Sequence, residues 1–373
     1  MRPPSTPREK SGFVLIGLNR RPAGRGESPR PAGLKVAWFV IATAALLVVV
    51  TVGVAFGPAS LPLSSVATEL SNRVFGTGFD TGLTAQQAAI VWNLRVPRVV
   101  LALLVGAMLA LAGGCYQGVF RNPLADPMLL GVAAGAGLAA TGFLVARAHG
   151  APLPAELLPL AAFVGALAAL AATYLLGAAG GRGQGPVTLI LAGVAVSAFL
   201  TAAQTYIQQR NVDTIASVYS WLLGRLAVAG WDEVLLLLPY VIVTSLIVLV
   251  RRRELDVLSV GDAEAAALGL HPQRSRLILL TAASLGTAAA VSVSGIIGFV
   301  GVVVPHVIRL LTGRSYRSIL PLSLLGGATF MILADLAART LQSPAELPIG
   351  VVTAFIGAPF FILVMRTTRE VTP

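Results

Sequence analysis

The sequence predicts an all-α polytopic membrane protein with about ten transmembrane helices. The chain has 373 residues, of which 56% are hydrophobic and only 12% are charged, with a mean hydropathy of +0.83. Soluble domains carry about 25% charged residues. Apolar segments long enough to cross a bilayer as helices recur along the chain, which excludes a soluble domain with a single core.

Each predicted helix is an apolar segment bounded by charged, Gly- or Pro-containing residues. The segments are Val36–Phe56, Val99–Gln117, Met128–Ala146, Leu157–Ala179, Val187–Ile207, Val234–Val250, Leu277–Val293, Ile296–Leu311, Ile319–Ala337 and Ile349–Met365. Only Ser294 and Gly295 separate the seventh from the eighth.

The distribution of Lys and Arg predicts the orientation. With ten spans and a basic N-terminal tail, 20 of the 27 Lys and Arg residues fall on the side of the termini and seven on the other. Positive residues favour the cytoplasmic side, so both termini are expected there, in a bacterial inner (plasma) membrane. The net charge of +11 is then explained by a basic surface facing membrane lipid, and no nucleic-acid partner is expected.

Three regions follow from this topology. Residues 1–35, rich in Pro, Arg, Gly and Ser, are expected to be a disordered basic cytoplasmic tail. Residues 36–366 form the transmembrane domain, with a cytoplasmic loop at 251–276, and residues 367–373 form a cytoplasmic C-terminal tail. On the outer side, residues 208–232 are expected to contain a short helix or a re-entrant piece, because Tyr219, Trp221 and Trp231 suit a membrane interface.

The stretch from Arg95 to Gly131 suggests a translocation path. It contains an uncharged run rich in Gly and Ala, which permits close helix packing and indicates a packed helix rather than a lone anchor. The run ends in Arg121-Asn122-Pro123-Leu124-Ala125-Asp126-Pro127. A broken, polar backbone beside the membrane is tolerated where it is buried in protein or lines a watery path.

No enzyme site is evident in the sequence. No Gly-rich loop followed by Lys-Ser or Lys-Thr is present, so an ATP site of the Walker type is not expected in this chain. Asp335 and Arg339, four residues apart in a helix, either neutralise one another or act in transport or docking. His306 is interpreted as a hydrogen-bonded structural residue, with a ligand or gating role as the alternative, and Cys115 as a small packing residue.

The loop at 251–276 is expected to hold one or two short helices at the cytoplasmic surface. Ser259 and Asp262 resemble a capping pattern, and Gly269 and Pro272 fit a helix stop. The loop is either a solvated connector or a docking element for a cytoplasmic partner.

Six motifs in order resemble the FecCD family, the permease subunits of ABC importers for iron–siderophores, haem and cobalamin. They are RVPR (95–98), RNPLADPMLLGV (121–132), LILAGVAVSA (189–198), SVGDAEAAALGL (259–270), GFVGVVVPHVIRLLTG (298–313) and LADLAART followed by ELPIGVVTAFIGAPFF (333–361). One motif would be weak evidence, but the ordered set is specific and covers the chain from about Arg95 to Met365.

The resemblance implies a type II ABC importer permease architecture, in which two permeases assemble with two ATPases and receive the ligand from an extracytoplasmic binding protein. Arg95, Arg98 and Arg339 match outward arginines that pair with acidic residues of the binding protein. Asn122 and Leu124 match a cytoplasmic gate. The segment that matches the ATPase-coupling helices includes Gly261, Asp262, Glu264, Ala265, Ala266, Leu268 and Gly269. No cofactor is expected in this chain, and ATP and Mg²⁺ would be used by the ATPase.

The expected function is therefore import of an iron–siderophore-type metal chelate, with cobalamin or haem as alternatives. A homodimer of permeases is expected, because one chain supplies all the motifs, and a heterodimer is the alternative. A secondary transporter driven by an ion gradient is the rival class, although such proteins usually carry intramembrane acids and this chain offers few besides Asp335. An intramembrane enzyme fits poorly because no nucleophile–base pair or metal-ligand set is present.

Overall fold

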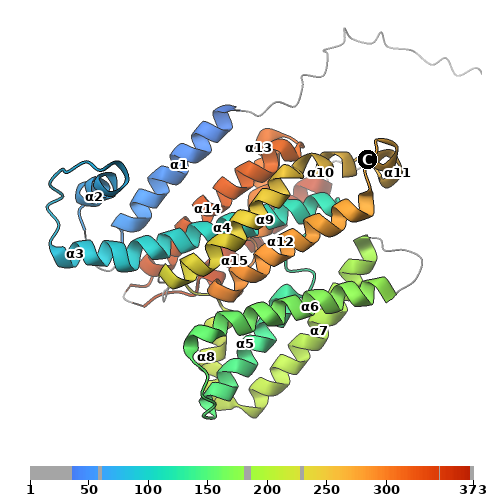
Figure 1. Cartoon of the computed structure of the whole chain (residues 1–373), viewed down its shortest axis with the longest axis horizontal. Helices are drawn as coiled ribbons and strands as arrows, with labels where there is room; N and C mark the ends of the chain where they lie inside the picture. The colour runs from blue at the N-terminus through green and yellow to red at the C-terminus, as the bar shows by residue number, and fades with distance from the viewer. Residues whose placement is uncertain (1–35, 58–60, 180–185, 227–230, 344, 370–373) are drawn as a thin grey trace, which may run out of the picture. The chain divides into compact units, whose positions relative to one another are not determined.

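A computed structural model describes residues 36–57, 61–179, 186–226, 231–343 and 345–369. Every regular element in these ranges is helical (Figure 1). The expectation of a disordered tail at 1–35 lies outside the described residues. The C-terminal helix continues to Arg369, three residues into the predicted tail, and residues 370–373 are again outside the described ranges.

Ten helices correspond to the ten predicted segments. They are α1 (Val36–Ala55), α4 (Val96–Val119), α5 (Val132–Ala148), α6 (Leu158–Ala179), α7 (Pro186–Arg210), α9 (Trp231–Val250), α12 (Pro272–Ser294), α13 (Val300–Thr312), α14 (Tyr316–Thr340) and α15 (Ile349–Arg369). Within the described ranges, seven helices are long and apolar enough to cross a membrane, while α5, α13 and the apolar part of α15 are shorter.

Short helices fill the connections. They are α2 (Leu63–Phe75), α3 (Ala85–Ile90), η1 (Val91–Arg95), η2 (Ala155–Leu157), η3 (Val212–Thr214), α8 (Ile215–Leu222), α10 (Arg252–Leu258) and α11 (Asp262–Ala267). The expected short helix in 208–232 is α8, although Trp221 is buried rather than interfacial. The loop at 251–276 contains two short helices, α10 and α11, as predicted.

The second predicted span is much longer than its apolar run. α3, η1 and α4 form one continuous helix from Ala85 to Val119, 35 residues long. At 1.5 Å per residue it extends about 52 Å, well beyond a hydrocarbon core of about 30 Å. Residues 91–95 form a π-helical turn, and the helix continues through Pro97 because proline is accepted in the first turn of an α-helix.

α4 lies at the centre of one group of helices, in contact with α9, α12, α13 and α14 (Figure 1). Its Gly and Ala residues are buried, which confirms that the run is a packed helix. A side chain at Gly106 would collide with the backbone of Gly327 on α14, and one at Gly113 would collide with Gly301 on α13. Close backbone contact of this kind stabilises helices in lipid, where hydrophobic attraction between helices is absent.

A second group contains α5, α6, α7 and α8. α12 connects the two groups, because it contacts α4 and α9 of the first and α5 and α6 of the second. Gly135 on α5 and Gly165 on α6 meet in the same manner as the α4 pairs. Cys115 is fully buried on α4, as expected for a packing residue.

Candidate functional site

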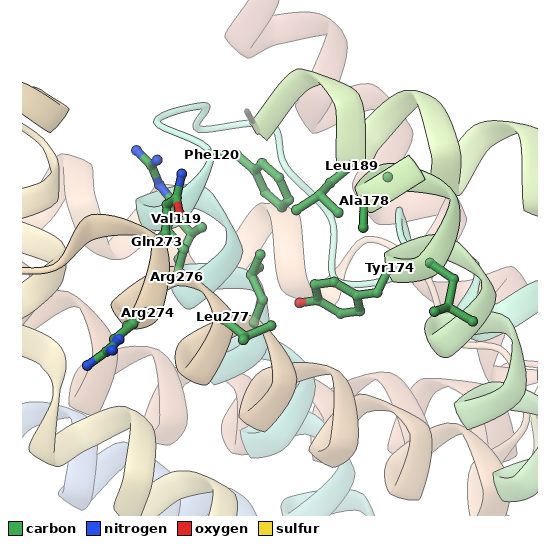
Figure 2. A pocket seen from close by; sticks show the side chains of 12 residues that line it. Val119, Phe120, Tyr174, Ala178, Leu189, Gln273, Arg274, Arg276 and Leu277 are labelled. Atoms are coloured by element: carbon green, nitrogen blue, oxygen red, sulfur yellow. The ribbon is translucent and has the colours of Figure 1, made fainter. Parts of the chain in front are cut away.

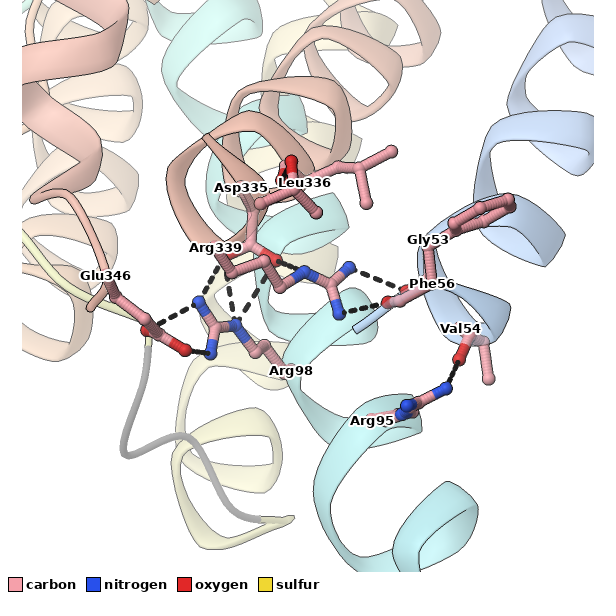
Figure 3. A network of polar contacts seen from close by, with 10 residues as sticks. Gly53, Val54, Phe56, Arg95, Arg98, Asp335, Leu336, Arg339 and Glu346 are labelled. Atoms are coloured by element: carbon pink, nitrogen blue, oxygen red, sulfur yellow. Dashed lines mark hydrogen bonds and ion pairs between the residues drawn. The ribbon is translucent and has the colours of Figure 1, made fainter. Parts of the chain in front are cut away.

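The first polar cluster lies at the start of α4 and the end of α14 (Figure 3). Arg98 donates from Nε to Asp335 Oδ1 at 2.9 Å and also forms an ion pair with that oxygen through Nη2 at 2.9 Å. Its two terminal nitrogens also donate to both carboxylate oxygens of Glu346, at 2.9 and 3.0 Å. Arg98 therefore bridges a carboxylate on α14 and one in the loop that precedes α15.

Arg339 lies on the other side of Asp335. Its Nε is 3.3 Å from Asp335 Oδ2, and both side chains are almost fully buried. This confirms that the two residues neutralise one another across one helical turn. Asp335 thus holds two arginines, which is the condition under which a buried carboxylate can stay charged.

Arg95 and Arg339 also bind the end of α1. Arg95 donates to the carbonyls of Val54 and Ala55, and Arg339 donates to those of Gly53 (2.6 Å) and Phe56 (3.0 Å). The last carbonyls of a helix have no partner within it, and they carry the negative end of the helix dipole. Two cations therefore cap α1, a helix otherwise mostly exposed on its apolar surface.

The three arginines predicted to face a binding protein thus lie together, but they differ in accessibility. Arg95 and Arg339 are 5% and 3% exposed, and their contacts are with this chain. Arg98 keeps 13% of its side chain accessible, and its partner Glu346 keeps 30%. Glu346 was not singled out from the sequence, because nothing in its local pattern signals a partner 248 residues away.

The second cluster lies beyond the other end of α4. Two short turns form the segment between α4 and α5. Asn122 Oδ1 accepts from Leu124 N at 3.0 Å, and Asp126 Oδ1 accepts from Met128 N at 2.7 Å. Each polar residue precedes a proline, a combination that favours such side-chain-to-backbone turns. Asn122 is exposed and Leu124 half-buried, so the predicted gate residues lie on a self-supporting turn at the surface.

Burial raises the pKa of the Asp126 carboxyl above its ordinary value, although the hydrogen bond from the Met128 N–H acts in the opposite direction. The turn therefore depends on a carboxyl group that lies in a poorly solvated position.

Asp262 connects this turn to the predicted coupling segment. Its carboxylate accepts hydrogen bonds from Arg276 at 2.6 and 2.7 Å and is also paired with Arg121. Arg121 additionally donates from Nε to Leu258 O at 2.7 Å. The Arg276 guanidinium, followed by that of Arg121, holds the pKa of Asp262 below its ordinary value. No local pattern signals the Arg121–Asp262 pair, which joins residues 141 positions apart.

The predicted coupling segment contains α11 and its two flanking glycines. Gly261 has φ = 133° and Gly269 has φ = 85°, values that L-residues rarely adopt, and Gly269 ends the helix as predicted. The predicted Ser259 cap is wrong: Gly261 occupies the N-cap position, and the Ser259 hydroxyl donates to Asp256 O at 2.6 Å.

The residues of α11, together with Leu268 directly after it, divide into a buried and an exposed set. Ala265 is fully buried, whereas Glu264 and Ala266 are exposed, and Leu268 is 70% exposed. The exposed side of this segment therefore carries small and apolar side chains beside the carboxylates of Asp262 and Glu264. Ala265 lies on the opposite, buried side of the same helix.

Asp256 on α10 fixes the neighbouring helix end. It accepts from the backbone N–H of Tyr316 at 2.7 Å and from the Ser315 hydroxyl at 3.1 Å. A carboxylate at a helix N-terminus binds unpaired N–H groups and complements the helix dipole. α10 is thereby attached to the start of α14, the helix that carries Asp335 near its other end.

The remaining candidate from the sequence is His306. In the described ranges, no three His, Cys, Asp or Glu side chains group as metal ligands would. His306 packs edge-on against Phe360 with ring centroids 5.9 Å apart, and its Nδ1 is buried without a hydrogen-bond partner. A gating role for His306 stays a prediction.

Comparison with known proteins places the chain in a family. The FecCD transport family matches residues 45–367. The chain is 39% identical over 331 residues to the uncharacterized ABC transporter permease protein YvrB of Bacillus subtilis, covering 89% of this chain and 94% of that protein. It is 37% identical to the hemin transport system permease protein HmuU of Yersinia pestis, covering 87% and 95%.

Another relative and a solved structure agree with this family match. The cobalamin import system permease protein BtuC of Halobacterium salinarum is 36% identical over 369 residues, covering 90% of this chain and 97% of that protein. A solved structure of a metal-chelate type ABC transporter in an inward-facing conformation superposes with a TM-score of 0.77 at 30% identity, covering 89% of this chain and 99% of that chain. The chain belongs to the FecCD transport family.

Proposed function

We propose that this chain is the membrane-spanning permease subunit of an ATP-driven importer that carries a metal chelate into the cytoplasm. The observation that carries the proposal is the family match over residues 45–367. Relatives along nearly the whole chain are described as permeases for cobalamin, hemin and Fe(3+) dicitrate. All three ligands are metal chelates, and an iron–siderophore-type chelate is our first candidate, with cobalamin and haem as alternatives.

The transport cycle assigned to this chain involves binding and movement but no covalent chemistry. Two copies would enclose the path, and separate ATPase subunits would bind and hydrolyse ATP with Mg²⁺. We assign ATPase contact to α11 and to Leu268, which follows it, because Ala266 and Leu268 are exposed and the start of the helix is fixed by the ion pair between Asp262 and Arg276. Movement of α11 would reach the turn at Asn122 and Leu124 through the Arg121–Asp262 pair.

We assign binding-protein docking to the end of the chain that carries Arg95, Arg98 and Arg339. Arg98 is the member whose guanidinium remains accessible, and Glu346 is the partner that an acidic residue of the binding protein would replace. Arg95 and Arg339 would support this surface by anchoring α1. In this proposal residues 36–366 form the permease domain, and both termini face the cytoplasm of a multi-pass inner-membrane protein.

The rival class, a transporter driven by an ion gradient, needs an intramembrane acid that can bind or release an ion. Asp335 is the acid that the sequence suggested for this role. It is 1% exposed and holds both Arg98 and Arg339, so its charge is already neutralised. This arrangement favours the ATP-driven function.

The test is uptake into vesicles that contain this chain together with its ATPase and binding protein. Labelled ferric siderophore, cobalamin and haem are supplied side by side, with ATP, without ATP, and with ATP and an ionophore. We expect ATP-dependent uptake of one chelate that is unaffected by the ionophore. Uptake that ignores ATP and collapses with the ionophore would refute the proposal.

A further inference from the structure

Pro305 leaves one carbonyl of α13 without its helical partner. In an α-helix each carbonyl accepts from the N–H four residues later. Proline has no N–H, so Pro305 cannot donate to the carbonyl of Gly301. Both residues are buried. Because an unpaired buried carbonyl costs free energy, a donor is expected from another part of the chain.

Gln117 on α4 supplies this donor. Its Nε2 donates to the carbonyl of Gly301 at 3.2 Å and to that of Val302 at 3.3 Å. Gly113, one turn earlier on α4, permits the close approach, because a Cβ there would collide with the Gly301 carbonyl. Gln117 is only 1% exposed, so these bonds lie inside the protein. α4 therefore provides a bond that α13 cannot make for itself.

Arg309 fixes the orientation of the Gln117 amide. Its Nη2 donates to Gln117 Oε1 at 3.1 Å. An arginine only donates and a backbone carbonyl only accepts, so a single orientation of the amide satisfies both sides. An ionised glutamate at this position would lack the donor, and a methionine would lack both groups. The contact therefore depends on the amide itself.

The same arginine connects the contact to the cytoplasmic loop. Arg309 Nη2 also donates to the Tyr316 hydroxyl at 3.1 Å, and its guanidinium lies 5.6 Å from the centre of that ring. The backbone N–H of Tyr316 in turn donates to Asp256 on α10 at 2.7 Å. A series of polar contacts therefore runs from α10, next to the proposed coupling helix, to the break in α13.

The gate turn, residues 121–127, also contacts Gly301. A Cβ at Gly301 would lie 2.7 Å from Pro127 Cδ, so the Pro127 ring packs directly against this glycine. Pro127 ends the turn that carries the predicted gate residues Asn122 and Leu124. A displacement of Gly301 away from α4 would therefore remove support from the gate turn.

The contact is separate from the cavity of about 410 Å³ at the same end of α4 (Figure 2). Phe120 lines this cavity, together with residues of α6, α7 and α12, whereas none of the described lining residues belongs to α13. Gln117 does not line it either. An occupant of the cavity would therefore not compete for the Gln117 amide.

We propose that Gln117 is a positioning residue of the transport cycle. It satisfies the carbonyl that Pro305 leaves unpaired, holds the break in α13 against α4, and so keeps Gly301 in contact with the gate turn. The role in transport rests on the proposed function, whereas the role in holding the turn does not. The contact gives the cytoplasmic loop a second connection to the gate turn, beside the Arg121–Asp262 pair.

A spin label at Leu124→Cys reports the gate turn in the purified full-length chain, since the native Cys115 is fully buried. Gln117→Met keeps the size and removes both hydrogen-bonding groups. We expect it to raise the ratio of mobile to less mobile label about fivefold, the change that loss of one buried hydrogen bond produces in an equilibrium. Gln208→Met on α7 is the matched control, because Gln208 is also buried but its Nε2 has no hydrogen-bond partner.

Pro305→Ala provides the rescue. Alanine restores an N–H that can donate to the Gly301 carbonyl within α13, so the Gln117 amide is no longer needed. We expect Gln117→Met combined with Pro305→Ala to lie within about twofold of Pro305→Ala alone, a strong departure from additivity. Gln117→Glu keeps the pair with Arg309 and loses only the donor, so it should resemble Gln117→Met and replaces it if that variant folds poorly. Absence of rescue, or an equal shift in Gln208→Met, would overturn the proposal.

Uptake into vesicles then tests the role in transport. The vesicles contain the chain with its ATPase and binding protein, and labelled ferric siderophore, cobalamin and haem are supplied. Gln117→Met should lower the chelate imported per ATP hydrolysed about fivefold, and Pro305→Ala should restore it. An unchanged ratio in Gln117→Met would refute the role in transport. Absence of ATP-dependent uptake by the wild type would refute the proposed function, and the spin label would still decide whether Gln117 holds the gate turn.

Discussion

Arg98 and Asp335, 237 residues apart in the chain, join the start of α4 to the end of α14 through hydrogen bonds of 2.9 and 3.2 Å from the same Nε. α4 and α14 also make close backbone contact at Gly106 and Gly327. The ion pair and the glycine contact therefore fix the same two helices at two levels, one polar and one apolar.

Replacing Asp335 should destabilise the protein strongly. Asp335→Asn removes the carboxylate that neutralises Arg98 and Arg339, and an uncompensated buried charge costs about 3–5 kcal/mol. The measurement is thermal unfolding in detergent, followed through the four tryptophans. Glu346→Gln is the control, because its pair with Arg98 is partly exposed and is expected to contribute below about 1 kcal/mol. Equal losses for the two variants would contradict a central role for Asp335.

The docking assignment predicts opposite effects for the two members of the exposed pair. Arg98→Gln should weaken binding of the binding protein about tenfold at low salt, since interfacial charges steer association. Glu346→Gln should leave docking unchanged or strengthen it, because the competing carboxylate is removed. Surface plasmon resonance at two salt concentrations measures both, with basal ATPase activity of the complex as the check on folding. If Glu346→Gln weakened docking as much as Arg98→Gln, Arg98 would not be the contact.

The coupling assignment predicts that exposed residues of α11, together with Leu268 directly after it, contact the ATPase. Ala266→Arg with Leu268→Arg should release the ATPase subunit during purification, because two bulky charges replace small and apolar contacts. Ala265 is unsuited to this test, since it is fully buried and its replacement would disturb α11 itself. Arg253→Ala, exposed on the adjacent helix, is the control. Recovery of the full complex from the double variant would refute the assignment.

The close contact between α4 and α14 predicts a steep dependence on side-chain size. Gly106→Val should lower the unfolding temperature strongly and Gly106→Ala by less, because even a Cβ would meet the Gly327 carbonyl and the Met331 side chain. Gly142→Ala on α5 is the control: nothing lies within 4 Å of its added Cβ, so a gain of up to about 1 kcal/mol is expected. A neutral Gly106→Val would show that the two helices can separate without cost.

The lowered pKa of Asp262 predicts that acid loosens α11. A carboxyl with a depressed folded pKa contributes its stabilisation above its ordinary pKa of 3.8 and loses it as the pH falls through the lower folded value. A spin label at Ala266→Cys should therefore keep the same mobility between pH 7 and 5 and become more mobile only as the pH falls below 3.8. Asp262→Asn should be mobile throughout, since Arg121 and Arg276 lose their anion. A pH-independent spectrum in the unmodified background would contradict this coupling.

The positions of the helices could be predicted from hydropathy, whereas the polar contacts between them could not. All ten apolar segments correspond to helices, and the small residues of 99–120 correctly indicated a packed helix. The start of that helix was placed too late, at Val99 instead of Ala85, because a hydropathy pattern treats Arg95 and Arg98 as solvent-exposed. Both are accommodated because acceptors arrive from α1, α14 and the loop before α15.

Short sequence patterns predicted structure correctly where the interacting residues are close together in the chain. Asn122 and Asp126 form turns with residues two positions away, and Gly269 ends α11 through its own backbone conformation. The Ser259 cap failed because Gly261 begins α11 and Asp262 is held by two distant arginines. The sequence contains those charges but not their distance in space.

The uninterrupted helix from Ala85 to Val119 has a mechanical consequence. Arg98 lies inside this helix and Arg121 lies two residues beyond its end at Val119, so the helical part between them is about 32 Å long. Arg98 is ion-paired with Asp335 and Arg121 with Asp262, so the helix connects two distant parts of the chain. A displacement at Asp262 would pass through the short turn at Phe120 and Arg121 and then along an unbroken helix to Arg98, so we expect the two ion pairs to move together.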